Sequence, residues 1–112
     1  MSATRIRVQL QEGRNDLKSV TLTRHGLSYL DVAMAVRTLH ENSEDLFPKR
    51  NDREAYRHAT DNLVRTLYRA MTGRFQAVSA GNQFREQFQA TREGRTAIYR
   101  IDVEITGMLA VR

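Results

Sequence analysis

The stretch "RTAIYRIDVEIT" (residues 95–106) carries the clearest strand pattern in the chain. Four apolar residues fall on one side of it, and charged or polar residues stand between them. These apolar residues are Tyr99, Ile101, Val103 and Ile105. Alternation with a period of two is typical of a β-strand that packs one face on a core and turns the other to solvent. We therefore predict a half-buried strand here and use it as the starting point for predicting the neighbouring elements.

The segment before this strand is compatible with two structures. Phe84 and Phe88 stand four residues apart, which suits one face of a helix, yet both also fall on one side of a strand. The sequence "REGR" (residues 92–95) has the composition of a hairpin turn. We favour a β-hairpin over 83–106, and a helix over 83–91 is the alternative.

A second hairpin is predicted near the N-terminus. In "TRIRVQLQ" (residues 4–11) the apolar residues Ile6, Val8 and Leu10 alternate with arginine and glutamine. The turn-forming sequence "EGRND" follows, and "LKSVTLTR" (residues 17–24) then shows a looser alternation. We expect two antiparallel strands joined by this turn.

The stretch 25–42 is predicted to contain a first helix, over residues 28–41. Ser28 can act as its N-cap, and Asp31 three residues later completes a pattern like a capping box. The body of this helix is apolar around most of its circumference, so it needs burial on nearly every side. We expect it to lie centrally between the sheet and a second helix, or to be covered by a second subunit.

A connector with the single proline, Pro48, leads to a second helix over 51–72. Asn51 is its predicted N-cap, and Gly73 is its predicted stop signal. At about 100° per residue, one side gathers apolar side chains and another gathers basic ones. The apolar set is Tyr56, Leu63, Val64, Leu67 and Met71, and the basic set is Arg57, His58, Arg65 and Arg69.

These elements predict a single α+β domain over residues 1–112. Two helices pack on one face of an antiparallel sheet, in the order ββ-αα-ββ, with a further strand optional. Residues 74–80 could supply a short strand, and Gly107 permits a turn before the apolar tail.

Composition narrows the classes of protein. The chain has 112 residues, 40% of them apolar and 28% charged, which is usual for a soluble globular domain. It contains no cysteine, no secretory h-region and no apolar run long enough to cross a membrane, so we expect a cytoplasmic protein. The net charge is +5, and all cations except Lys18 and Lys49 are arginines. Arginine suits phosphate and carboxylate recognition, although an arginine-rich codon bias explains the same excess without a ligand.

No catalytic or cofactor motif is present. His25, His40 and His58 lack metal-binding spacings, and the glycines form neither a dinucleotide-binding nor a P-loop pattern. We therefore expect no cofactor and no metal, and a binding role more readily than an enzymatic one.

Two acids on the last predicted strand allow one metal hypothesis. Asp102 and Glu104 project from the same face, and paired acids of this kind can hold Mg²⁺ in nucleases. Ion pairs with Arg85, Arg92 or Arg95 across neighbouring strands explain these acids more simply.

The leading functional hypothesis is a small non-enzymatic module that binds nucleic acid, or a nucleic-acid-processing complex, through the basic face of the second helix. Phosphate contacts of this kind give salt-sensitive and largely sequence-independent binding. The candidate contact residues on this helix are Arg53, Arg57, His58, Arg65, Tyr68 and Arg69, and Arg5 and Arg7 of the first strand join them.

The alternative is a protein-interaction or assembly subunit. Such a protein would form a homodimer through the apolar helix 28–41 or the C-terminal segment, or would bind an acidic protein surface as an inhibitor or adaptor. No membrane partner is expected.

The C-terminal sequence "GRTAIYRIDVEITGMLAVR" (residues 94–112) resembles the last strands of RelE-type ribosome-dependent ribonuclease toxins. The match rests on "YRI" and the strand pattern, and it covers less than a fifth of the chain. The resemblance implies a small ribonuclease as a remote alternative. An N-terminal hairpin replaces the single strand of that family, and no catalytic base carries over to a residue of this chain.

Overall fold

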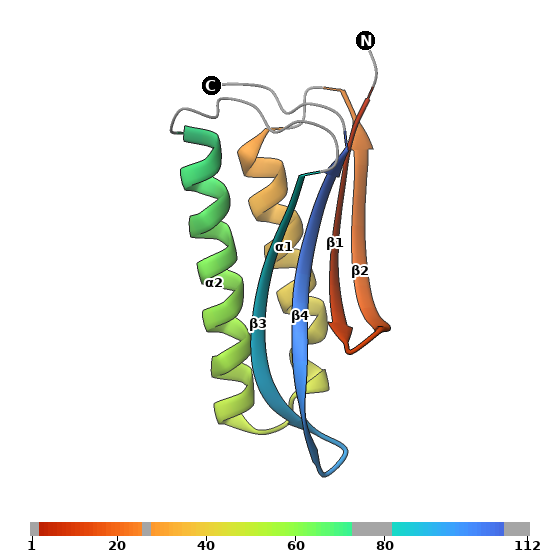
Figure 1. The fold of residues 1–112 in the computed structure, drawn as a ribbon, viewed down its shortest axis with the longest axis vertical. Coiled ribbons are helices and arrows are strands. Elements are labelled where there is room, and N and C mark those ends of the chain that lie inside the picture. Colours follow the sequence, from red (N-terminus) through yellow and green to blue (C-terminus); the bar gives the residue numbers. More distant parts are fainter. Residues whose placement is uncertain (1–2, 26–27, 73–81, 107–112) are drawn as a thin grey trace.

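Two β-hairpins form one four-stranded antiparallel sheet with the strand order β2-β1-β4-β3 (Figure 1). The strands are β1 (Thr4–Glu12), β2 (Asn15–Arg24), β3 (Asn82–Arg92) and β4 (Arg95–Thr106). The computed structural model describes residues 3–25, 28–72 and 82–106. Both predicted hairpins are confirmed, and the alternative of a helix over 83–91 is wrong. The predicted strand at 74–80, the stop at Gly73 and the tail after Thr106 lie outside the described residues.

Strand register brings the apolar residues of both hairpins onto one face. Val8 of β1 pairs with Val103 of β4, and Ile6 and Leu10 pair with Ile105 and Ile101. All six side chains are buried. The two central strands therefore come from opposite ends of the chain, and their pairing closes the domain.

The turn between β3 and β4 explains why this hairpin is tight. Arg92 pairs with Arg95, so the loop has two residues, Glu93 and Gly94. Both have positive φ, 54° and 77°. Two-residue hairpin loops favour this left-handed geometry because it matches the twist of the strands, and glycine adopts it without strain.

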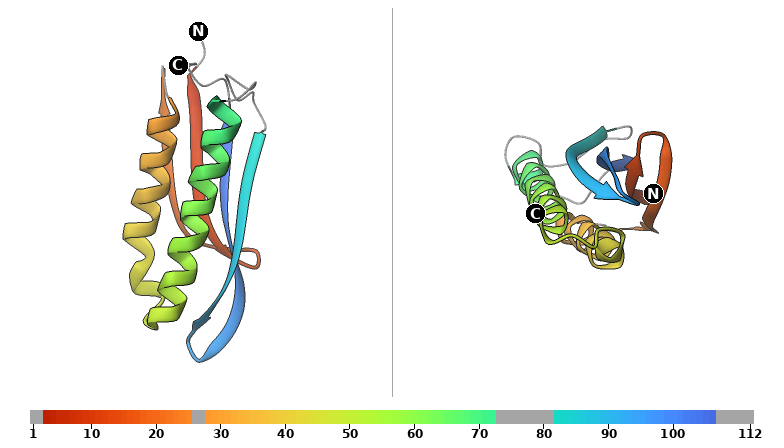
Figure 2. Two further views of the ribbon diagram at one scale, coloured as in Figure 1. Left: turned by 90° about the vertical axis from the view of Figure 1, so that its left-hand side faces the viewer. Right: turned by 90° about the horizontal axis from the view of Figure 1, so that it is seen from below.

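The helices α1 (Tyr29–Ser43) and α2 (Arg50–Thr72) lie side by side over one face of the sheet, as the two views in Figure 2 show. A 3-10 turn, η1 (Glu44–Leu46), joins them to the connector. α1 packs against β1 and β2, and α2 packs against β3. The predicted fold class, with two helices on one face of an antiparallel sheet, is confirmed. None of the described helices is long and apolar enough to cross a membrane.

Two predictions about the helices need correction. α1 does not lie between the sheet and α2, because both helices occupy the same layer. Its outer side therefore remains exposed instead of buried. Asn51 is not an N-cap, because α2 already begins at Arg50. The capping box of α1 is confirmed, with the Ser28 backbone N–H donating to Asp31 Oδ2 at 2.8 Å.

Four aromatic rings fill the core where the connector meets the sheet. Phe47, just before Pro48, is fully buried and packs edge-to-face on Tyr56, Phe88 and Tyr99 with ring centroids 5.1–5.5 Å apart. Such pairs stabilise a core beyond the burial of apolar area alone. The connector thus contributes a central core residue.

A buried acid ties the two hairpins together at the edge of the core. Glu12, 8% exposed, pairs with Arg95 and with Arg92, whose Nη1 lies 3.4 Å from Glu12 Oε2. Burial by itself would raise the pKa of Glu12, but the guanidinium groups of Arg95 and Arg92 that pair with it bring the pKa below its ordinary 4.5. Arg92 and Arg95 therefore pair with Glu12, and of the three alternative partners predicted for the acids of the last strand it is Arg85 that pairs with Asp102.

Candidate binding surface

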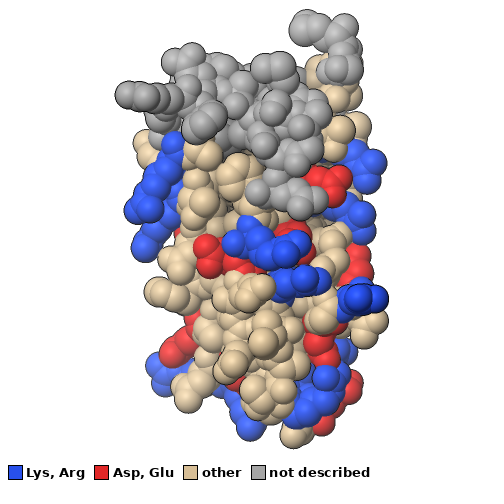
Figure 3. All heavy atoms as spheres, in the orientation of Figure 1, with Lys and Arg blue, Asp and Glu red and all other residues tan. Residues whose placement is uncertain are grey.

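The outer side of α2 carries a row of unpaired arginines. Arg57, Arg65 and Arg69 are exposed, and none of them forms an ion pair within the described part of the chain. Figure 3 shows basic side chains gathered along the edge of the molecule that the C-terminal half of α2 forms. The amphipathic character predicted for this helix is confirmed, because Tyr56, Leu63 and Leu67 on its other side are buried. His58 is exposed as well.

The side chain of Arg53 is used in hydrogen bonds within the fold. Its side chain is half-buried, and its Nη1 donates to the carbonyl oxygens of Phe47 and Pro48 at 3.3 and 2.5 Å. These bonds hold the connector against the start of α2. Of the arginine candidates on this helix, Arg53 is therefore the one with fewest donors left for a ligand.

A groove of about 440 Å³ runs between α1 and α2 on the outer side of the helical layer. Its walls include Leu30, Ala33, Met34 and Arg37 from α1 and Val64 and Arg65 from α2. Leu30 and Met34 are 63% and 61% exposed, which is unusual for large apolar side chains that neighbour each other on one helix face. Arg37 is exposed and, like Arg65, has no ion-pair partner among the described residues.

Tyr68 stands beside this groove. Its side chain is 53% exposed, and its ring packs edge-to-face on Tyr29 of α1 with centroids 5.4 Å apart. Burial raises the pKa of Tyr29, and the neighbouring Tyr68 raises it further. The phenol of Tyr29 therefore stays neutral at physiological pH, and the exposed edge of Tyr68 adds an amphipathic side chain beside the groove.

The bottom of the groove holds polar groups in an apolar setting. The His40 ring packs edge-to-face on Tyr56 at 4.9 Å, and His40 Nε2 lies 3.3 Å from Glu44 Oε1. Burial raises the pKa of Tyr56 to about 12. The neighbouring Ser43 lowers this pKa and the charge of Glu44 raises it. A phenol with this pKa is neither a base nor a nucleophile at neutral pH.

Arg5 and Arg7 lie on the other side of the molecule. Both project from β1 onto the open face of the sheet, away from the helices, and Arg7 Nη2 lies 3.4 Å from Asp16 Oδ2. The structure thus separates these two strand arginines from the arginines of α2, with the sheet and the core between them. A single flat ligand cannot contact both sets.

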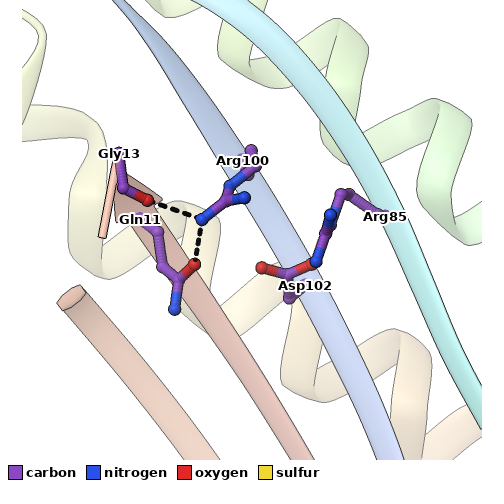
Figure 4. Close-up of polar contacts among 5 residues, drawn as sticks. All are labelled: Gln11, Gly13, Arg85, Arg100 and Asp102. Atoms are coloured by element: carbon purple, nitrogen blue, oxygen red, sulfur yellow. Dashed lines mark hydrogen bonds and ion pairs between the residues drawn. The ribbon is translucent and has the colours of Figure 1, made fainter. Parts of the chain in front are cut away.

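The open face of the sheet is polar. Arg85 Nε donates to Asp102 Oδ1 at 2.5 Å, which confirms the predicted ion pair across β3 and β4 (Figure 4). The described aromatic side chains of the strands, Phe84, Phe88 and Tyr99, all fall on the covered face. Among the described residues, the open face of the sheet therefore has no exposed aromatic ring on which the bases of a single-stranded nucleic acid could stack.

Two sequence-based hypotheses of catalysis can be compared with the structure. Within residues 3–25, 28–72 and 82–106, no three histidine or carboxylate side chains gather as metal ligands would. Tyr99, which carries the resemblance to ribonuclease toxins, is fully buried between other rings. Comparisons with protein-family models, curated proteins and solved structures found no match.

The sequence indicated the arginines of α2 but not the groove beside them. Leu30, Met34 and Arg37 lie within the helix 28–41 that the homodimer alternative invokes, but they are not singled out as contact residues, because a helix that is apolar on most sides does not reveal which side stays uncovered. The signal that could have found them is their spacing, since Leu30 and Met34 stand four residues apart on a face separate from the buried Val32, Ala35, Val36 and Leu39.

Proposed function

We propose that the protein is a non-enzymatic binding module whose helical groove receives an acidic, amphipathic helix of a partner protein. The observation that carries this proposal is the exposure of Leu30 and Met34 in the wall of one groove, each more than half accessible, with the half-exposed Tyr68 one helical turn beyond Val64 of the opposite wall. Contiguous exposed apolar side chains with a polar rim are typical of protein interaction sites. Removing such side chains from water lowers the free energy when an apolar surface of a partner covers them.

The shape of the groove favours a helical partner. Leu30 and Met34 on α1, and Thr60 and Val64 on α2, each stand four residues apart, so both helices line the groove with side chains one turn apart. Ridges at this spacing pack into the grooves of a third helix, and an amphipathic helix supplies anchors at matching intervals. A third helix would extend the helical layer without disturbing the sheet.

The charges around the groove favour an acidic partner. Arg37 and Arg65 line it, and Arg57 and Arg69 stand nearby on α2 without acidic partners among the described residues. Asp61 is the one carboxylate in the described lining. Carboxylates flanking the anchors of a partner helix would therefore meet unneutralised guanidinium groups, which raises the association rate and sets orientation.

Nucleic-acid binding is a second candidate function. The row formed by Arg57, Arg65 and Arg69 favours it, because three unpaired guanidinium groups on one helix can contact phosphates without reading the bases. This candidate leaves the exposure of Leu30 and Met34 unexplained, since a phosphate backbone offers no apolar surface to cover them. We therefore rank it second.

The proposal can be tested with a synthetic helical peptide that carries leucines at positions i, i+3 and i+7 and glutamates on both flanks. We expect fluorescence anisotropy to show binding in the micromolar range, because few anchors are involved. Replacing Leu30 and Met34 with serine should weaken binding about tenfold or more. Replacing Arg37 and Arg65 with glutamine should weaken it and flatten its salt dependence.

Matched controls come from the opposite face of the molecule. Ile98, which is 55% exposed on β4, can be replaced with serine, and Arg5 with glutamine, without effect on peptide binding. Equal binding of a scrambled peptide, or no change in the Leu30 and Met34 variant, would refute the groove. Salt-sensitive binding of a random duplex that depends on Arg57, Arg65 and Arg69 would support the second candidate. A mass that rises with concentration in sedimentation would instead identify a second copy as the occupant.

A further inference from the structure

The open face of the sheet has a step where the shorter hairpin ends. Glu12, the last residue of β1, pairs with Tyr99, and β4 continues four residues further to Arg95 beside β3. The β3–β4 hairpin therefore projects past the β1–β2 turn (Figure 1). A concavity of about 330 Å³ lies at this step, lined by Gly13, Arg14, Gln87, Ile98 and Arg100.

Arg100 is held in place over the step. Its Nη2 donates to Gln11 Oε1 at 2.9 Å and to the carbonyl oxygen of Gly13 at 2.5 Å (Figure 4). A guanidinium group has five N–H donors, so three of those on Arg100 have no acceptor within the described residues. A guanidinium that the fold has already oriented loses little conformational freedom when an anion binds it.

The surroundings of Arg100 leave its charge uncompensated. Arg14, also in the lining, is exposed and has no ion-pair partner in the described part of the chain. Among the residues that the structure describes, none of the lining side chains is a carboxylate. Three acids on the adjoining strands pair with other arginines: Glu12 with Arg92 and Arg95, Asp16 with Arg7, and Asp102 with Arg85.

The rest of the lining is suited to a ligand with two parts. Gln87 offers an amide that can donate to an oxyanion, and Ile98 presents a large apolar side chain that is 55% exposed. On a face that is otherwise polar, this isoleucine has no evident role in the fold. It provides an apolar wall beside two guanidinium groups.

We infer that this step binds an oxyanion, a phosphate or carboxylate group, on a small ligand whose apolar portion rests on Ile98. Arg100 and Arg14 bind the anion, and Gln87 adds a hydrogen bond to it. The site lies on the face of the sheet opposite the helical groove, so it is independent of the proposed partner helix.

The test is a titration of the full chain followed by ¹H–¹⁵N spectra, with phenyl phosphate, benzoate and inorganic phosphate as probes. Saturable shifts should centre on Gly13, Gln87 and Ile98 and on the Nε–H of Arg100. Arg14→Gln should weaken phenyl phosphate about tenfold through the loss of a charge-assisted hydrogen bond. Ile98→Ser should weaken phenyl phosphate but leave inorganic phosphate unchanged.

Arg57→Gln is the matched control, because it removes the same charge from the helical face. We expect it to leave all three affinities unchanged. Whichever of phenyl phosphate and benzoate binds more tightly than the other shows whether the site prefers a phosphate or a carboxylate, and either result supports the site. Shifts that never saturate and are as large around Arg57 as around Arg100, or an Arg14→Gln variant that binds like the wild type, would overturn the inference.

Discussion

Replacing Phe47 with alanine tests whether the connector really belongs to the core. The side chain is fully buried and contacts three aromatic rings. Removing a buried phenylalanine costs about 3–5 kcal/mol of unfolding free energy, and the loss of three ring contacts places Phe47 in the upper part of this range. We therefore expect a loss of about 4–5 kcal/mol, which is a large part of the roughly 5–15 kcal/mol typical of a whole domain.

The measurement is urea unfolding followed by far-ultraviolet circular dichroism. With a slope of about 1.5–2 kcal/mol per molar, the loss corresponds to a midpoint lowered by about 2–3 M. Ile98→Ala is the control, because this side chain is more than half exposed on the open face, and it should shift the midpoint only slightly. A loss below about 1.5 kcal/mol for Phe47→Ala would show that the ring is not enclosed between α2 and the sheet.

Three further predictions concern stability and charge. Glu12→Gln should destabilise the protein by about 1–3 kcal/mol at pH 7. Because the folded pKa of Glu12 is lowered, its contribution is present above about pH 4.5 and disappears as the pH falls through the folded value, so unfolding curves of variant and wild type should converge in acid. A constant difference down to pH 3 would contradict this assignment. Leu63→Ala should cost about 2–5 kcal/mol in the same assay, since this residue is fully buried, and a cost near zero would mean that the faces of α2 are reversed. Glutamine at Arg57, Arg65 and Arg69 together should leave the unfolding midpoint nearly unchanged, because exposed charges without partners contribute little to stability. A large shift would reveal a structural role for these arginines.

The two candidate sites differ in how each was recognised. On α2 the arginines were visible as a helical stripe, and the structure adds that they face outward without acidic partners among the described residues. The step beneath Arg100 was not visible in the sequence. It depends on Gln11 and Gly13 lying beside a residue that is nearly ninety positions later in the chain.

Local patterns in the sequence determined the class of fold. Alternation in 4–11 and 95–106 identified strands, because a pleated strand repeats every two residues whatever surrounds it. The amphipathic pattern of 51–72 and the Ser28 and Asp31 pair identified helices, because capping and helical spacing are local properties. These features follow from neighbours in the chain, so they could be predicted.

Only the tertiary structure decided which surfaces meet. It placed β1 beside β4, buried Phe47 of the connector, paired Glu12 with Arg92 eighty residues away and left Leu30 and Met34 uncovered. Each of these outcomes depends on how separate elements pack, and a helix such as α1 that is apolar on most sides is compatible with several packings. Local patterns cannot choose among them, because the free-energy differences arise from contacts between residues that are far apart in the chain.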